Sequence, residues 1–261
     1  MGSNPAAPTN TITIPVVRHR RSRKFQPMNN YEYCAEFAAR SGAATALDFG
    51  CGAGEVVQLM RSKQIEAFGC DAYYGGGQYA PLPEVAQFIT GMPEGRIPFA
   101  AGFFDIVINN QVLEHVTDLD GTIAEMARVL KPGGTVLSIF PDNRMWREGH
   151  CGIPFVQHFP ANRARTLYAY ALCCLGFGYF KGGKTRWQWA VDACEWLDKW
   201  TYYRSYDDIT AAFERHFGPI RKLEADWLDA RLGLRIPLPE QVKQAFVHRM
   251  AGLVIACSRV A

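Results

Sequence analysis

Residues 48–54, with the sequence DFGCGAG, place three glycines at alternate positions directly after an aspartate. An apolar run precedes this segment, and apolar residues with helical spacing follow it. Such glycines allow a sharp turn from a strand into a helix and let backbone N–H groups approach a ligand closely. Downstream, a second apolar run ends in Asp71, whose carboxylate can accept hydrogen bonds from the hydroxyls of a ribose. Together, the two features predict a binding site for a nucleoside cofactor.

The residue after the third glycine indicates which nucleoside cofactor fits. Dinucleotide-binding proteins have the pattern G-x-G-x-x-G, whereas Glu55 stands here where the last glycine of that pattern would be. A carboxylate at the start of a helix competes with a pyrophosphate for the positive end of the helix dipole. S-adenosylmethionine has no phosphate and carries a sulfonium and an ammonium, which acidic neighbours favour. The pattern therefore favours a methyl donor over the nicotinamide cofactor of an oxidoreductase.

From this point the sequence resembles the class I S-adenosylmethionine-dependent methyltransferases, closely over residues 30–142 and loosely near the C-terminus. The resemblance implies a Rossmann-like methyltransferase fold with S-adenosylmethionine as the cofactor. Residues 147–155 are also similar to a segment of bacterial methyltransferases found with polysaccharide or natural-product biosynthesis. The segments that carry the family resemblance follow one another with helix-sized spacing: residues 47–54, Asp71, residues 97–107, 112–116 and 130–137.

The resemblance implies a set of cofactor contacts. In it, Asp48 supports the glycine turn and faces the methionine ammonium, and Asp71 binds the ribose. Ala72 packs near the adenine, and Asn110 contacts the cofactor beside the transferred methyl group. The remaining expected contacts come from the backbone. Gly50, Cys51 and Gly52 supply them at the turn, and Met92 and Pro93 supply them at the adenine edge.

Histidines after the expected fifth strand are the candidate catalytic residues. His150 and His158 follow that strand at the edge of the sheet where acceptor loops lie, and an imidazole can take a proton near neutral pH. Alternatively, one of them only binds a loop carbonyl. His115 is interpreted as structural or adjacent to the cofactor. Metal binding by His150, Cys151 and His158 lacks a fourth ligand, so no metal is predicted.

Charge is concentrated in one short segment of the chain. The net charge is +3 over 261 residues, and residues 18–24 alone contain five positive side chains. The rest of the chain is close to neutral, so nucleic acid is an unlikely partner. Residues 1–28 are predicted to be a mobile basic arm, which either meets an acidic acceptor or remains solvated.

Cysteine usage and hydropathy indicate a cytoplasmic protein. The eight cysteines include no C-x-x-C pair, and several lie in apolar strands, as is typical of free thiols in a reducing compartment. The longest apolar run, residues 167–180, is too short to span a membrane. No pattern in the chain predicts an oligomeric state.

Strands and helices alternate along residues 29–261, which predicts one α/β domain with a doubly wound, mainly parallel, seven-stranded sheet. A helical insertion, about residues 143–204, follows the fifth strand. Residues 219–226 and 252–259 are expected to form an antiparallel pair at the edge. The other expected strands are 45–49, 66–70, 86–90, 104–109 and 134–140, and the expected helices of the core are 29–40, 54–62, 119–129 and 205–217.

One helix of the insertion is expected over residues 185–203, with aromatic side chains on a single stripe. Trp189, Trp196, Trp200 and Tyr203 recur at intervals of three and four residues or their sum. The stripe either packs in the core of the insertion or lines an acceptor pocket as part of a lid. Both interpretations can hold for different residues.

These features favour methyl transfer to a small-molecule or glycan acceptor, with a hydroxyl oxygen as the expected atom. The donor already carries an activated methyl group, so alignment and desolvation are the main tasks of the protein. Two alternatives stay open. One is an RNA or protein methyltransferase that uses the basic arm, and the other is a non-catalytic scaffold that binds the cofactor.

Overall fold

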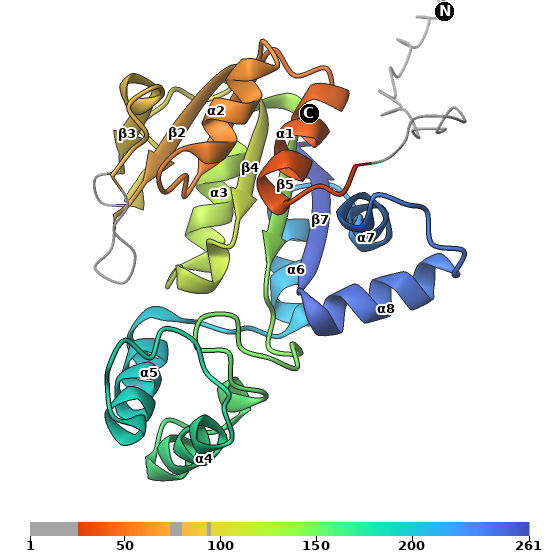
Figure 1. Ribbon diagram of the computed structural model, residues 1–261. Coiled ribbons are helices and arrows are strands. Elements are labelled where there is room, and N and C mark those ends of the chain that lie inside the picture. The colour runs from red at the N-terminus through yellow and green to blue at the C-terminus, as the bar shows by residue number, and fades with distance from the viewer. Residues whose placement is uncertain (1–25, 74–79, 93–94, 261) are drawn as a thin grey trace, which may run out of the picture.

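The computed structural model describes residues 26–73, 80–92 and 95–260. Its sheet has seven strands in the order β3-β2-β1-β4-β5-β7-β6 (Figure 1). The first five strands pair in parallel, and β7 runs antiparallel to both of its neighbours. The strands are β1 (Thr45–Phe49), β2 (Glu66–Asp71), β3 (Ile89–Gly91), β4 (Phe104–Asn110), β5 (Leu130–Phe140), β6 (Arg221–Lys222) and β7 (Leu253–Ser258). The doubly wound, mainly parallel sheet predicted from the sequence is confirmed.

The strand order reverses between β1 and β4. In open α/β sheets, the crevice outside the carboxyl ends of the strands at such a point is where ligands bind. The segments that follow Phe49, Asp71 and Asn110 therefore meet at one edge of the sheet. This edge is where the sequence places the cofactor.

Helices cover both faces of the sheet. One face packs against α1 (Asn30–Arg40), α2 (Glu55–Ser62), α7 (Glu224–Leu232) and α8 (Glu240–Met250). The other face packs against α3 (Leu119–Val129) and α6 (Tyr206–His216). Alternation along β4 separates the two cores, since Ile106 and Ile108 face the first and Val107 faces the second. Near-continuous apolar strands are typical of a parallel sheet buried on both faces.

Local side-chain hydrogen bonds explain where two of these helices begin. The Asn29 side chain accepts a hydrogen bond from the Glu32 N–H at 2.9 Å, and the Glu32 carboxylate accepts one from the Asn29 N–H at 2.8 Å. This reciprocal pair is a capping box at the start of α1. Ser205 caps α6 in the same region of the chain where the sequence predicts a helix start.

Two predicted strands are wrong in detail. Residues 86–90 form a short 3₁₀ turn (Ala86–Phe88) before β3 begins at Ile89. The strand predicted over 219–226 is reduced to Arg221–Lys222, and α7 follows at once. The apolar residues Leu223, Trp227 and Leu228 recur at helical spacing and are all buried in the core on one face. The sequence analysis also missed α8.

The insertion after β5 forms a small lobe of its own. Helices α4 (Arg163–Cys174) and α5 (Arg186–Trp200) pack together and lie beyond the carboxyl end of the sheet (Figure 1). The lobe has a separate apolar core, to which the helices and the segment before α4 contribute, and which includes Ile153, Val156 and Trp189. The predicted helical insertion is confirmed, although α4 was not among the predicted helices. Within the ranges that the structure describes, every helix is too short or too polar to cross a membrane.

Candidate cofactor and acceptor site

The glycine turn between β1 and α2 is held by positive φ angles. These are +72° at Gly50, +52° at Gly52 and +93° at Gly54. A Cβ atom on Gly50 would lie 2.4 Å from Cγ2 of Val112, and one on Gly54 would lie 2.5 Å from Cδ1 of Ile89. The first and third glycines are therefore required by the packing of neighbouring side chains as well as by the backbone conformation.

The N–H groups of the turn bind the end of β2. The N–H groups of Gly50 and Cys51 donate to the carbonyl oxygen of Cys70 at 2.8 and 3.2 Å. The N–H of Gly52 donates to Oδ2 of Asp71 at 2.8 Å. All three donors are thus occupied within the protein. Backbone contacts from Gly50, Cys51 and Gly52 to a ligand would have to come from their carbonyl oxygens, which suits a cationic ligand better than an anion.

Asp71 ends β2 and clamps the turn. Its second oxygen, Oδ1, accepts a hydrogen bond from the N–H of Tyr73 at 2.7 Å. A carboxylate can accept about four hydrogen bonds, so room for two hydroxyl donors remains. The sequence analysis missed Tyr73, which has a φ of +46° and a buried hydroxyl without a hydrogen-bond partner among the described residues. Ala72 lies exposed between the two.

Asp48 is a buried acid with no counter-charge among the described residues. Only 3% of this residue is exposed, and the described part of the chain offers its carboxylate no hydrogen bond or ion pair. Burial, followed by the nearby charges of Asp71 and Glu55, raises the pKa of Asp48 to about 8. A site that concentrates negative charge in this way favours a cationic ligand. The ammonium and sulfonium of S-adenosylmethionine fit that requirement.

Two further predicted cofactor contacts, Asn110 and Met92, already have hydrogen-bond partners within the protein. Oδ1 of Asn110 accepts a hydrogen bond from the Asn30 amide at 3.2 Å, and Oδ1 of Asn30 accepts one from the Trp227 indole at 3.1 Å. This chain of bonds fixes the Asn110 side chain at the end of β4. The N–H of Met92 donates to the carbonyl oxygen of Asp71 at 3.0 Å, so it is already bound. Pro93 lies outside the described residues.

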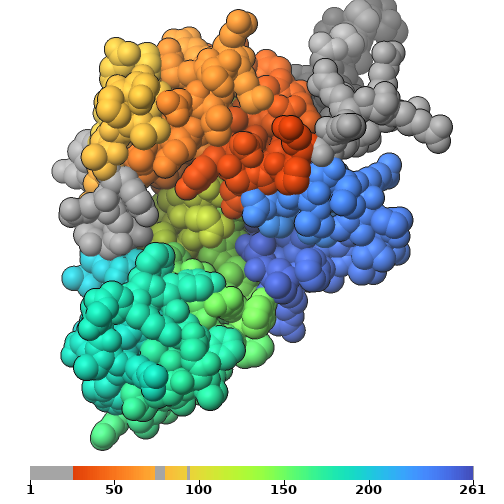
Figure 2. Space-filling model, viewed as in Figure 1, coloured from red at the N-terminus to blue at the C-terminus, as the bar shows by residue number. Residues whose placement is uncertain are grey.

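A group of polar side chains gathers on the acceptor side of the same edge. We call Glu114, His115, Glu148, His150 and Tyr203 the histidine cluster. The first two come from the 3₁₀ turn after β4, the next two from the loop after β5, and the tyrosine follows α5. In Figure 2 the surface is recessed between the insertion lobe and the upper body of the protein, with yellow-green residues at its floor.

Hydrogen bonds fix both imidazoles of the cluster. Nδ1 of His150 lies 2.7 Å from Oε1 of Glu148, and Nδ1 of His115 lies 2.6 Å from the carbonyl oxygen of Trp200. The Tyr203 hydroxyl also donates to Oε1 of Glu148. The two imidazole ring centroids are 4.9 Å apart. Each imidazole is therefore held at Nδ1 by an oxygen atom of a neighbouring segment or loop residue.

The two carboxylates of the cluster differ in their pKa values. Burial would raise the pKa of Glu148, but His150, the Cys151 N–H and Tyr203 outweigh burial and lower this pKa to about 2. Burial raises the pKa of Glu114 to about 7, against weaker opposing contributions from its own N–H and His150. The pKa of His150 is raised, because Glu148 outweighs the opposite effect of burial. Glu148 is thus the permanent anion of the site.

The other candidate histidine is placed differently. Nε2 of the exposed His158 is hydrogen-bonded to the carbonyl oxygen of Asn143, as the alternative interpretation from the sequence allowed. His150, Cys151 and His158 do not form a group with metal-ligand spacing among the described residues. Glu114, His115 and Glu148 were not expected as catalytic residues. The sequence signals for them were the place of Glu114 and His115 in the family-like segment 112–116, and the position of Glu148 two residues before His150.

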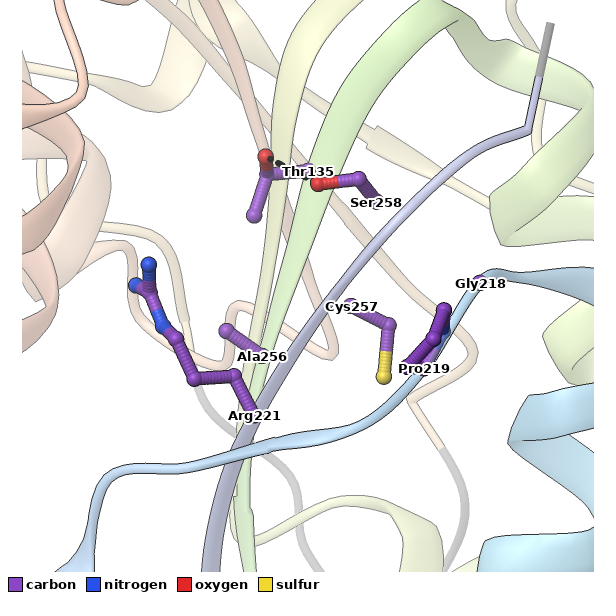
Figure 3. Close-up of a pocket in the computed structure, with 7 residues that line it drawn as sticks. All are labelled: Thr135, Gly218, Pro219, Arg221, Ala256, Cys257 and Ser258. Atoms are coloured by element: carbon purple, nitrogen blue, oxygen red, sulfur yellow. Dashed lines mark hydrogen bonds between the residues drawn. The ribbon is translucent and has the colours of Figure 1, made fainter. Parts of the chain in front are cut away.

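A pocket elsewhere in the fold does not belong to this site. A pocket of about 220 Å³ lies where β7 pairs with β6 and with the beginning of β5, away from the strands' carboxyl ends (Figure 3). It is lined by Arg221 and otherwise by small residues, and Figure 3 shows the Cys257 thiol directed toward Pro219. Its one hydroxyl pair, Thr135 and Ser258, is 3.4 Å apart. These residues offer no general base.

Comparison with known proteins finds similarity to methyltransferases. A family model described as a methyltransferase domain matches residues 47–138. The ubiquinone biosynthesis O-methyltransferase of Escherichia coli O7:K1 is 28% identical over 123 residues, which cover 43% of this chain and 51% of that protein. The corresponding protein of Mesorhizobium japonicum is 28% identical over 131 residues, 45% of this chain and 53% of that protein. The chain thus spans about half the length of these curated relatives.

Solved structures with a similar fold include an S-adenosylmethionine-dependent methyltransferase from Mesorhizobium loti. That structure has a TM-score of 0.47 and 15% identity, over 82% of this chain and 90% of that chain. A geranyl diphosphate C-methyltransferase from Streptomyces coelicolor A3(2) has a TM-score of 0.44 and 18% identity, over 87% of this chain and 77% of that chain.

Proposed function

We propose that the chain is an S-adenosylmethionine-dependent methyltransferase that transfers a methyl group to a hydroxyl oxygen of a small-molecule or glycan acceptor, because a methyltransferase-domain model matches residues 47–138. The observation that carries this proposal is the pairing of two sites at one edge of the sheet. Asp48, a buried acid that has no counter-charge in the described part of the chain, lies near the end of β1, and His150, whose imidazole is oriented by a carboxylate, follows β5.

The residues at the ends of β1, β2 and β4 would hold the cofactor. Asp48 accepts from the ammonium, with carbonyl oxygens of Gly50, Cys51 and Gly52 nearby. Asp71 accepts from the ribose hydroxyls while it keeps its bonds to the glycine turn. The adenine would lie near Ala72 and Met92. When bound, S-adenosylmethionine supplies an activated methyl group on its sulfonium.

His150 would receive the proton of the acceptor hydroxyl. Since a carboxylate only accepts hydrogen bonds, Nδ1 of His150 carries the proton in its bond to Glu148, and Nε2 keeps its lone pair. The fixed negative charge of Glu148 stabilises the imidazolium that forms when Nε2 takes a proton. The geometry favours a hydroxyl acceptor because deprotonation is what this pair can supply.

Helix α5 would close the acceptor side against water. The Trp196 ring centroid lies 4.8 Å from that of His150 and 5.9 Å from that of His115. An indole in this place keeps water away from the imidazoles and strengthens the electrostatic interactions around them. We assign the α4–α5 lobe the role of a lid over the acceptor. Trp189, in contrast, packs in the core of the lobe.

The test is a transfer assay with isotopically labelled S-adenosylmethionine and a panel of phenols, catechols and sugars. Label incorporated into a hydroxyl-bearing acceptor, and lost in His150→Ala, would support the proposal. His216→Ala is the matched control because that imidazole pairs with Asp120 on the outside of α3 and α6. Label found only on carbon or nitrogen acceptors would overturn the choice of atom. Cofactor binding without transfer to any acceptor would favour a scaffold.

A further inference from the structure

Glu114 has no partner for its charge in the described structure. Only 1% of the residue is exposed, and neither carboxylate oxygen has a hydrogen-bond partner among the described residues. Buried polar groups in folded proteins are almost always paired, and a carboxylate is the most costly to leave alone. Proton uptake alone would leave both oxygens still without a partner. A cation bound at the carboxylate would satisfy them directly.

Two imidazoles of the cluster lie next to each other, with their ring centroids 4.9 Å apart, and the Nδ1 atom of each is hydrogen-bonded to an oxygen atom. A carbonyl or carboxylate oxygen only accepts, so Nδ1 carries the proton in both His115 and His150. The lone pair of each neutral ring is then on Nε2. A histidine whose Nδ1–H is held by a carboxylate or a backbone carbonyl is the usual arrangement behind a metal-ligating nitrogen. Here both backing groups are present before any ion is bound.

The distances are close to those of a metal site. The ligand atoms of Glu114, His115 and His150 all lie within 4.8 Å of one another. Atoms bound to one ion at about 2.1 Å each can be at most about 4.2 Å apart. A small movement of the side chains therefore closes the set around an ion. Of the described residues, these form the single group of three or more such ligands.

We propose that Glu114, His115 and His150 bind a divalent transition-metal ion, such as Zn²⁺ or Mn²⁺. Two imidazoles and one carboxylate favour these ions over Mg²⁺ and Ca²⁺, which prefer oxygen ligands. The charge of Glu148 behind His150 and that of Glu114 together compensate the two charges of the ion. With three protein ligands, at least one coordination position stays open for another molecule.

The ion would change how the acceptor is activated, and this step rests on the proposed function. In the metal-bound protein Nε2 of His150 is a ligand, so it no longer takes the proton. An acceptor hydroxyl bound at the open position has a lowered pKa and releases its proton to solvent. The oxygen then forms its bond to the methyl carbon as the carbon–sulfur bond of the cofactor breaks. The products are the methyl ether and neutral S-adenosylhomocysteine.

The experiment uses the full chain stripped with a chelator and titrated with Zn²⁺, Mn²⁺ or Co²⁺. We expect one ion per chain by calorimetry and visible absorption bands on Co²⁺ binding. Glu114→Gln keeps the side-chain shape and should weaken binding at least tenfold, and His150→Gln is the second variant should the first not fold. His216→Ala should bind as the wild type does. Binding that neither site variant weakens, or no stoichiometric binding to the wild type, would overturn the inference.

The two proposals fail in different ways. Methyl transfer by stripped protein in the presence of chelator would refute the ion's part in activation and leave His150 as the proton acceptor. One ion bound per chain, with no transfer to any acceptor, would confirm the metal site and refute the proposed function. Retained S-adenosylhomocysteine binding by each variant shows that the variant is folded.

Discussion

The imidazole of His150 is joined to the buried carboxylate of Glu148 by a 2.7 Å contact between Nδ1 and Oε1. Glu148 also accepts hydrogen bonds from the N–H groups of His150 and Cys151, at 2.8 and 2.5 Å. One loop after β5 thus contains both members of the pair and the backbone that holds them. The ring is held at Nδ1, which leaves Nε2 for the role that each proposal gives it.

Replacing Glu148 with glutamine should reveal this pair through the pH dependence of stability. The folded-state pKa of Glu148, about 2, lies below its ordinary value of 4.5, so its contribution is present above pH 4.5 and lost as the pH falls toward 2. The pKa of His150 is raised above 6.5, so the contribution of the pair is complete below pH 6.5 and lost as the pH rises through the folded value.

The difference in unfolding free energy between wild type and Glu148→Gln should therefore be greatest between pH 4.5 and 6.5. We expect about 2 kcal/mol there, as is typical of charge-assisted hydrogen bonds. Urea denaturation of both proteins from pH 3 to pH 9 measures it. A difference that does not vary with pH would show that the carboxylate acts through packing alone.

Asp48→Asn should stabilise the ligand-free protein at alkaline pH while it weakens cofactor binding. The folded-state pKa of Asp48, about 8, lies above its ordinary value of 3.8, so ionisation costs stability as the pH rises between these values. Removal of the ionisable group should gain on the order of 5 kcal/mol at pH 8 and much less at pH 4. Thermal denaturation at both pH values tests this. Equal melting temperatures of the wild type and Asp48→Asn at pH 8 would contradict the burial of an unpaired Asp48 charge.

Gly50→Ala should destabilise the turn through one specific contact. The new methyl group would meet Val112 at 2.4 Å in a backbone with φ of +72°, whereas Gly42 has φ of +73° and no atom within 4 Å of the added Cβ. Gly42→Ala should therefore cost only the backbone strain, about 1 kcal/mol, and Gly50→Ala about 1–3 kcal/mol more. Combining Gly50→Ala with Val112→Ala should recover part of the loss. No recovery would mean that backbone strain dominates.

Two tryptophans of α5 should respond differently to truncation. Trp196→Ala should lower the rate of transfer at saturating substrate, because its ring covers both imidazoles of the histidine cluster. Trp189→Ala should instead lower stability by about 3–5 kcal/mol, since this residue is 4% exposed in the core of the lobe. Trp187→Ala is the control for both variants, because Trp187 is 42% exposed and its truncation should change neither the rate nor the stability as much. Equal rate losses for Trp196→Ala and Trp187→Ala would refute the proposed lid.

The sheet could be predicted because its signals are local. The apolar runs that end at Phe49 and Asp71, and the helix of residues 119–129, are each identified by a short stretch of sequence. The segment after residue 219 could not be predicted in this way. Leu223, Ala225 and Trp227 also alternate with polar residues as a strand would, and only their burial against α1 and the sheet selects a helix.

The histidine cluster could be predicted only in part, for a physical reason. His150 follows β5 and was expected at the site, but its partners come from segments that are distant in sequence. Glu114 and His115 follow β4, and Tyr203 follows α5. No periodicity links three such segments. The position of His158, bound to the carbonyl oxygen of Asn143, likewise depends on how the loop after β5 folds back.

Calorimetric titration with S-adenosylhomocysteine tests most directly whether the edge beside β1 and β2 is the cofactor site. We expect micromolar binding to the wild type and at least tenfold weaker binding, about 1.4 kcal/mol, to Asp71→Ala. The matched control is Asp207→Ala, which removes an exposed acid on α6 and should leave affinity unchanged. Absence of binding to folded wild-type protein, or equal affinity in Asp71→Ala, would contradict the assignment of this site.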